Sequence, residues 1–150
     1  MKKLILSALI VIMGVAAFSQ TRIARVKTKE ELLNEQYCSG LFKTYDGTYF
    51  DLLNDNATLS AKGYLNILDW LDGRVAGLQV YTARNNERLP FIRDSRAGIY
   101  VDEVAVSADF LNSLSVNDIA MIKIIKGPFA GAGNSPGGVI AIYTASGEDE

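Results

Sequence analysis

The chain has 150 residues, a length that allows one small domain. Its 15 lysines and arginines are set against 17 acidic residues, and the formal net charge of −2 argues against nucleic-acid binding. Histidine is absent and cysteine occurs once, at Cys38, so the composition excludes an internal disulfide and argues strongly against a structural zinc site.

The first twenty residues, MKKLILSALIVIMGVAAFSQ, have the pattern of a secretory signal peptide. Two lysines are followed by an apolar run from Leu4 to Ala17 and by the small residue Ser19. This run is shorter than the roughly 20 apolar residues that cross a bilayer, which makes a retained membrane anchor the weaker interpretation. We therefore predict that residues 1–19 are removed on export and that no membrane-spanning segment remains.

Residues 20–59 form a weakly patterned lead-in. Thr28 and Glu31 have the spacing of a capping box and predict a short helix through the two leucines that follow. Asp46-Gly47 lies among aromatic and β-branched residues and indicates either a hairpin or an isolated turn. The sequence leaves open whether this lead-in folds with the residues after it.

A stronger pattern begins at Ser60, which we expect to cap a helix. The apolar residues of this stretch recur at intervals of three and four, as on one helix face. They are Leu65, Leu68, Leu71 and Val75. Gly77 is the expected helix stop, because glycine accepts a left-handed conformation, and residues 78–80 then alternate like a strand.

The polar stretch TARNNERLP is predicted to be a loop, and a strand is predicted over Gly98–Val104. Asp102 and Glu103 are adjacent, so in a strand they would point to opposite faces and could not act as a carboxylate pair. We expect them to form a turn.

Two serine caps precede the last part of the chain. Ser107 is expected to cap one short helix, and Ser115 with Asp118 another, before the periodicity changes to that of a strand. The last strand is predicted over Val139–Thr144. Strands and helices interleave without a repeated βαβ unit, which predicts an α+β fold, a small mixed β-sheet with packed short helices.

The stretch IKIIKGPFAGAGNSPGGVIAIYTASG places a glycine-rich loop between two apolar runs. A phosphate-binding loop needs a helix after it, whereas here a strand follows and Lys126 precedes the glycines. The loop also contains Gly-x-Ser-x-Gly around Ser135, but a hydrolase elbow needs a following helix and a histidine base. We therefore expect a hairpin, no enzymatic activity, no cofactor and no metal, and an exported serine hydrolase is the weakest alternative.

These segments, in this order, resemble the plug domain of TonB-dependent outer-membrane receptors, especially the Bacteroidetes-type nutrient receptors. The resemblance runs from about Ser60 to Gly147 through LDWLDGRVAGLQV, FIRD, IYVDEV and a closing segment. Residues 112–147, that closing segment, are its most specific part. The residues that match the family's motifs, with structural or partner-contacting roles implied, are Gly73, Arg74, Gly77, Arg93, Asp102, Asp118, Lys126, Gly127, Gly137 and Gly138.

The resemblance implies a compact fold that, in full receptors, sits inside a β-barrel, blocks the pore and yields when the energy-coupling protein pulls. Asp94 and Glu103 stand where the family has glycine, so we expect the turns there to differ. A barrel needs about 10 residues for each membrane strand, so we expect no transport by this chain alone. The start QTRIARVKTKEE does not resemble an energy-coupling segment.

With the resemblance, the chain divides into a signal peptide (1–19), a lead-in (20–59), a plug-like domain (60–147) and an acidic tail (148–150). We expect an exported, non-enzymatic binding module in the periplasm or on the periplasmic side of the outer membrane. The expected partner is an outer-membrane β-barrel or another envelope protein, and a small ligand is left open. The alternative is a remnant or split piece of an outer-membrane nutrient receptor.

Overall fold

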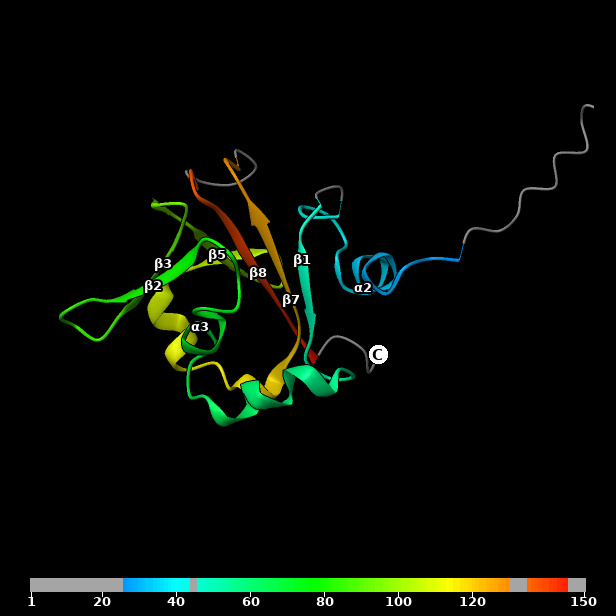
Figure 1. Ribbon diagram of the computed structural model, residues 1–150, viewed down its shortest axis with the longest axis horizontal. Helices are drawn as coiled ribbons and strands as arrows, with labels where there is room; N and C mark the ends of the chain where they lie inside the picture. Colours follow the sequence, from blue (N-terminus) through cyan, green and yellow to red (C-terminus); the bar gives the residue numbers. More distant parts are fainter. Residues whose placement is uncertain (1–25, 44–45, 130–134, 146–150) are drawn as a thin grey trace, which may run out of the picture.

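A five-stranded mixed sheet forms the centre of the computed structural model, which describes residues 26–43, 46–129 and 135–145 (Figure 1). Its strands are β1 (Thr48–Asp51), β5 (Gly98–Val101), β6 (Val104–Val106), β7 (Ile119–Lys126) and β8 (Gly138–Thr144). They lie in the order β1-β7-β8-β5-β6, and β5 runs parallel to β8 while the other neighbours are antiparallel. The predicted mixed sheet is confirmed, as are its last two strands.

Within the described residues, a smaller antiparallel sheet and five short helical segments complete the fold. The second sheet contains β2 (Leu78–Thr82), β3 (Arg88–Ile92) and β4 (Ser95–Arg96), in that order. The helices are α2 (Lys29–Tyr37), α3 (Ile67–Leu71) and the 3-10 helices η1 (Asn56–Gly63), η2 (Ala108–Asn112) and η3 (Val116–Asp118). In Figure 1, α2 lies beside β1, and the hairpin of β2 and β3 extends away from the large sheet.

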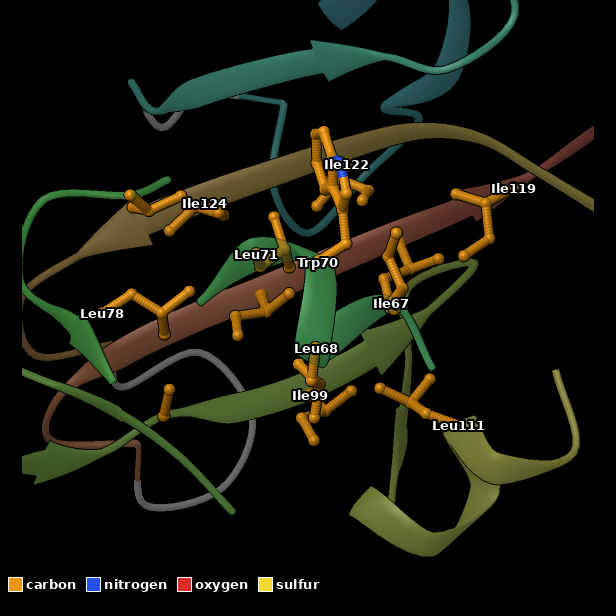
Figure 2. Close-up of a cluster of buried hydrophobic side chains, with 14 of the residues drawn as sticks. Ile67, Leu68, Trp70, Leu71, Leu78, Ile99, Leu111, Ile119, Ile122 and Ile124 are labelled. Atoms are coloured by element: carbon orange, nitrogen blue, oxygen red, sulfur yellow. The ribbon is translucent and has the colours of Figure 1, made fainter. Parts of the chain in front are cut away.

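Side chains alternate along the central strands, so each face of the large sheet builds its own core. One face carries Ile122, Ile124 and Ile142, which pack with α3 and η2 around Trp70 (Figure 2). The opposite face carries the side chains that alternate with these along the strands. They pack under α2 and the turn after it. This second cluster contains Leu33, Cys38, Phe42, Tyr100, Met121, Ile125, Phe129, Val139, Ala141 and Tyr143. Because both faces are covered, β7 and β8 are buried almost throughout.

The predicted capping box is present at the start of α2. The backbone N–H of Glu31 donates to Thr28 Oγ1 at 3.2 Å, and the N–H of Thr28 donates to Glu31 Oε2 at 3.0 Å. The cap before β7 is also present, with Ser115 Oγ accepting from the N–H of Asn117. Ser107 precedes η2 as expected, but its side chain makes no cap hydrogen bond.

The single long helix predicted from Ser60 is wrong. The stretch divides into η1 and α3, and Leu65 between them is 93% exposed although its spacing matches the buried leucines. Asn66 starts α3 by accepting the N–H of Leu68 at its side-chain oxygen, 2.9 Å away. The chain turns after Leu71, and Gly77 has the predicted left-handed backbone, with φ of 81° directly before β2.

Two other local expectations differ from the structure. The polar stretch after Thr82 is not a simple loop, because its second half forms β3 and pairs with β2. Asp46-Gly47 does not close a hairpin among the described residues, because β1 pairs with β7 instead. A Cβ on Gly47 would lie 2.8 Å from the carbonyl oxygen of Ile124, so close approach to β7 explains this glycine.

The predicted signal peptide and the acidic tail lie outside the described residues. The lead-in contributes α2, which packs on the large sheet, and β1, which is an edge strand of that sheet. Within the part of the chain that the structure describes, no helix has the length and apolar character needed to cross a membrane.

Candidate functional site

The ten motif residues do not meet in one site. Some surround the turns between α3 and the second sheet, and two lie near the end of the large sheet where β5 and β8 finish. The remaining ones lie at the opposite end, where β7 passes into the glycine loop. These groups are, in that order, Gly73, Arg74, Gly77 and Arg93; Asp102 and Asp118; and Lys126, Gly127, Gly137 and Gly138.

Arg74 is exposed but fixed in place by aromatic contacts. Its guanidinium lies 4.9 Å from the centroid of the Trp70 ring and 5.7 Å from that of Tyr64. It also donates from Nη1 to the carbonyl oxygen of Trp70 at 2.6 Å, at the end of α3. A planar cation over an aromatic face is attractive, so Arg74 is held facing outward beside the second sheet.

We expect Arg74→Lys to lower the free energy of unfolding by about 0.5–1 kcal/mol, because lysine cannot stack its charge over two rings in this way. Urea unfolding of the two proteins checks this. Arg84→Lys is the matched control, since Arg84 is exposed in the turn between β2 and β3. An equal effect of both substitutions would contradict the role of stacking.

The residues at two expected glycine positions adopt glycine-like backbones. Arg93 and Asp94 have φ of 52° and 63° in the turn between β3 and β4, and Asp102 and Glu103 have 47° and 66° between β5 and β6. Two successive residues with positive φ make the tight hairpin turn that matches strand twist. The turns therefore keep this geometry without glycine, which costs each non-glycine residue some conformational strain.

Asp102 and Glu103 use their side chains in different directions. Asp102 accepts two hydrogen bonds from Thr144, from the backbone N–H and from Oγ1, both at 2.9 Å, and so fastens the end of β8. Glu103 reaches the lead-in, where its carboxylate accepts three successive backbone N–H groups at 3.0 Å. The donors are Ser39, Gly40 and Leu41. The predicted turn is confirmed, and the carboxylate contacts are an addition that sequence reasoning missed.

Burial alone would raise the pKa of Glu103, but the hydrogen bonds from the N–H groups of Gly40, Leu41 and Ser39 outweigh it and hold the pKa below its ordinary value. Tyr143 and Cys38 face the same carboxylate, and burial raises the pKa of both, so neither changes charge in acid. The ionised form of Glu103 therefore binds this turn best.

A carboxyl group whose pKa is lowered on folding stabilises the protein above its unfolded pKa of about 4.3, and loses that contribution as the pH falls through the folded value. We therefore expect the difference in melting temperature between the natural protein and Glu103→Gln to be constant near neutral pH. The difference should narrow below about pH 4. Thermal unfolding from about pH 7 to pH 3 measures it, and a difference that widened in acid would contradict the assignment.

The described ends of the glycine loop, at Gly127 and Gly137, are hydrogen-bonded to each other and to the small sheet. The N–H of Gly127 donates to the carbonyl oxygen of Gly137, and the N–H of Gly137 donates to that of Arg96 in β4, both at 3.2 Å. Ser135 is buried and is followed by β8 rather than by a helix. The structure therefore provides neither the strand-loop-helix order of a phosphate site nor the elbow of a serine hydrolase.

Lys123 is a further residue that sequence reasoning missed. It lies on the α2 side of β7 with no exposed surface, and Nζ donates to the carbonyl oxygen of Phe42 at 2.6 Å and to Asn34 Oδ1 at 2.7 Å. The Tyr49 ring lies 5.1 Å from the ammonium group. Burial lowers the pKa of Lys123 and raises that of Tyr49 to about 12. A single lysine within the apolar run IAMIKII was the available signal.

A polar cavity of about 370 Å³ lies where α2 meets β1. The Lys29 ammonium stands at its wall, 3.2 Å from Asp51 Oδ2 and 3.6 Å from Asp55 Oδ2. These groups satisfy one another. Among the described residues, no group of three or more histidine, cysteine, aspartate or glutamate side chains is placed to hold a metal ion.

Comparison with known proteins gives the sequence family and the fold. The family described as TonB-dependent Receptor Plug Domain matches residues 54–139. The structure is similar to the ferric yersiniabactin uptake receptor FyuA from Yersinia pestis, with a TM-score of 0.52 and 20% identity, over 68% of this chain and 17% of the receptor. The RagAB peptide importer in its closed-closed state matches with a TM-score of 0.48 and 24% identity, over 65% of this chain and 12% of that one. No curated protein sequence matches.

Proposed function

Because the chain belongs to the TonB-dependent receptor plug domain family, we propose that it works by binding, as an exported and non-enzymatic plug-like module. Its proposed partner is an outer-membrane β-barrel or another envelope protein. The proposed location is the periplasm or the periplasmic side of the outer membrane, after removal of residues 1–19.

The family match over residues 54–139 is the observation that carries this proposal, and the fold supports it. The chain spans less than a fifth of the length of the solved receptors that it resembles.

The motif residues divide into two proposed roles. The glycines shape turns and permit close backbone approach, as the positive φ values of Gly73, Gly77, Gly127 and Gly138 indicate. The charged motif residues Arg74, Arg93 and Asp118 are exposed and are proposed to contact the partner. Lys126 lies beside the glycine loop and is also proposed to contact the partner.

In-cell cross-linking of the tagged protein tests the proposal, followed by mild-detergent purification from separate periplasmic and outer-membrane fractions. A tagged periplasmic protein of similar size is the control for unspecific recovery. We expect one β-barrel protein to be enriched with the natural chain and not with the control. If the tagged protein were recovered from both fractions without any envelope protein, the proposal would be contradicted.

The identity of the recovered barrel distinguishes the two forms of the proposal. A barrel without a plug of its own would make this chain one half of a split receptor. A complete receptor would make it an independent binding module. Sequencing the recovered protein by mass spectrometry separates these results.

A further inference from the structure

Residues 26–43, which we call the strap, cover the α2 side of the large sheet without joining it as a strand. Three buried apolar side chains hold the strap down: Leu33, Cys38 and Phe42, which are exposed by 6%, 1% and 0%. The partly buried Tyr37 and Leu41 pack beside them. The Phe42 ring meets Tyr100 edge-on with centroids 5.0 Å apart and lies 5.2 Å from Phe129. Within α2, Leu33 is buried and Tyr37 is partly buried, with its ring centroid 6.4 Å from that of Tyr143, so the helix makes its apolar contacts through these two side chains.

Two charged side chains of the sheet hold the polar groups of the strap. Glu103 accepts the three N–H groups of residues 39–41, and Lys123 donates to the Phe42 carbonyl oxygen and to Asn34. The strap's partner groups in these contacts are uncharged. Both charges would regain water if the strap lifted, and this recovered hydration offsets part of the hydrogen bonding that is lost.

The larger core and the hydrogen-bonded strands are built without the strap. Among the described residues, the core around Trp70 contains none from 26–43, and the strands of the large sheet all lie after them. The family match begins at residue 54, so the strap lies outside the matched region while Glu103 and Lys123 lie inside it. The strap also forms ion pairs from Lys29 to Asp51 and Asp55. Lifting the strap would expose one face of the sheet and leave the larger core closed.

We infer that the strap is a conformational device that opens as a unit while both sheets stay folded, and that Glu103 and Lys123 control how often it opens. Regions with few apolar anchors open at lower free energy than the cores they cover. Opening uncovers an aromatic and aliphatic face from Tyr100 to Tyr143 that is closed in the resting structure. This inference does not depend on the identity of the partner.

The chain carries its own probe for this opening. Cys38 is the single cysteine of the sequence, lies in the strap and is 1% exposed, so a thiol reagent reaches it only when the strap lifts. We would measure the rate at which 5,5′-dithiobis(2-nitrobenzoate) labels the folded protein, with increasing low concentrations of urea. We expect labelling without global unfolding, with a weaker dependence on urea than global unfolding shows.

Glu103→Gln is expected to speed labelling by about tenfold, because it replaces one acceptor oxygen with an NH2 group and leaves one uncharged amide oxygen for the three N–H groups. Leu33→Ala should also speed the labelling of Cys38. This substitution weakens the contact from within the strap and leaves the residues of the sheet unchanged. Glu87→Gln is the matched control, since Glu87 pairs with Arg96 at 3.8 Å in the second sheet. It should leave the labelling rate unchanged.

The global stability of each variant, from urea unfolding followed by circular dichroism, distinguishes the strap from the whole fold. Both free energies are measured from the closed protein, so Glu103→Gln and Leu33→Ala should lower the free energy of strap opening and that of global unfolding by similar amounts. The inference requires that, in both variants, labelling keep a smaller free energy and a weaker urea dependence than global unfolding. It is overturned if labelling has the free energy and urea dependence of global unfolding in every variant. It is also overturned if Glu103→Gln labels at the natural rate.

Discussion

Gly138→Ala is expected to lower the free energy of unfolding by at least about 3 kcal/mol, enough to unfold a marginally stable domain. Gly138 begins β8 with φ of 119°, a backbone that residues with a Cβ rarely adopt. A Cβ there would lie 2.1 Å from the carbonyl oxygen of Ile125, which is backbone of the paired strand and cannot move aside. Urea unfolding followed by the fluorescence of Trp70 measures the loss.

Two other glycines separate the causes of this effect. Gly127 has φ of 109° with no heavy atom within 4 Å of the position that a methyl group would take, so Gly127→Ala tests backbone strain alone, at about 1–3 kcal/mol. Gly63 has neither a positive φ nor a close neighbour, and Gly63→Ala should be neutral or slightly stabilising. If Gly138→Ala were no worse than Gly63→Ala, the tight junction between β7 and β8 would be refuted.

Trp70→Ala is expected to lower the free energy of unfolding by about 3–5 kcal/mol. Trp70 is 1% exposed, meets Phe50 of β1 edge-on at 5.3 Å, and donates from Nε1 to Ser60 Oγ at 3.0 Å. Its ring thus joins α3, η1 and the sheet, and its removal opens a cavity that these backbones cannot close. Because Trp70 is the single tryptophan, circular dichroism must replace fluorescence as the measurement.

Trp70→Phe and Ser60→Ala are the comparison variants. Phenylalanine keeps most of the ring volume and loses the indole N–H, while Ser60→Ala removes the acceptor and leaves the ring in place. Each of these two substitutions should lower the free energy of unfolding by less than half as much as Trp70→Ala does, since one net hydrogen bond contributes about 1 kcal/mol. A Trp70→Ala effect below about 1 kcal/mol would contradict the central position of this residue.

The sequence was informative where the structure is set by neighbouring residues. The capping box of α2 acts over three residues, and the apolar runs of β7 and β8 are adjacent strands joined by a glycine loop, so both were predictable. The turn at Asp102-Glu103 was also predictable from adjacent turn formers. Its positive φ values were not, because neither residue is glycine.

The errors have tertiary causes. Leu65 fits the helical spacing of Leu68 and Leu71, but the helix η1 ends before it and the next helix, α3, begins after the cap residue Asn66. The side-chain amide of Asn66 donates a hydrogen bond to Asn112 Oδ1 at 2.9 Å. The strand β3 begins inside the polar stretch that was predicted to be a loop, because its pairing with β2 is a contact that polarity alone does not indicate. The partners of Glu103 and Lys123 are more than 60 residues away, beyond the reach of spacing arguments.

The position of β8 has a consequence for the order of folding. This strand is the last of the described chain, yet it lies between β7 and β5 and supplies side chains to both cores. Neither core can close until Thr144 has been synthesised, so the chain cannot fold in stages from its N-terminus, and its long-range pairings make folding slow. A chain that stays unfolded until β8 has been synthesised can still be threaded through a narrow translocation pore, which suits the proposed export.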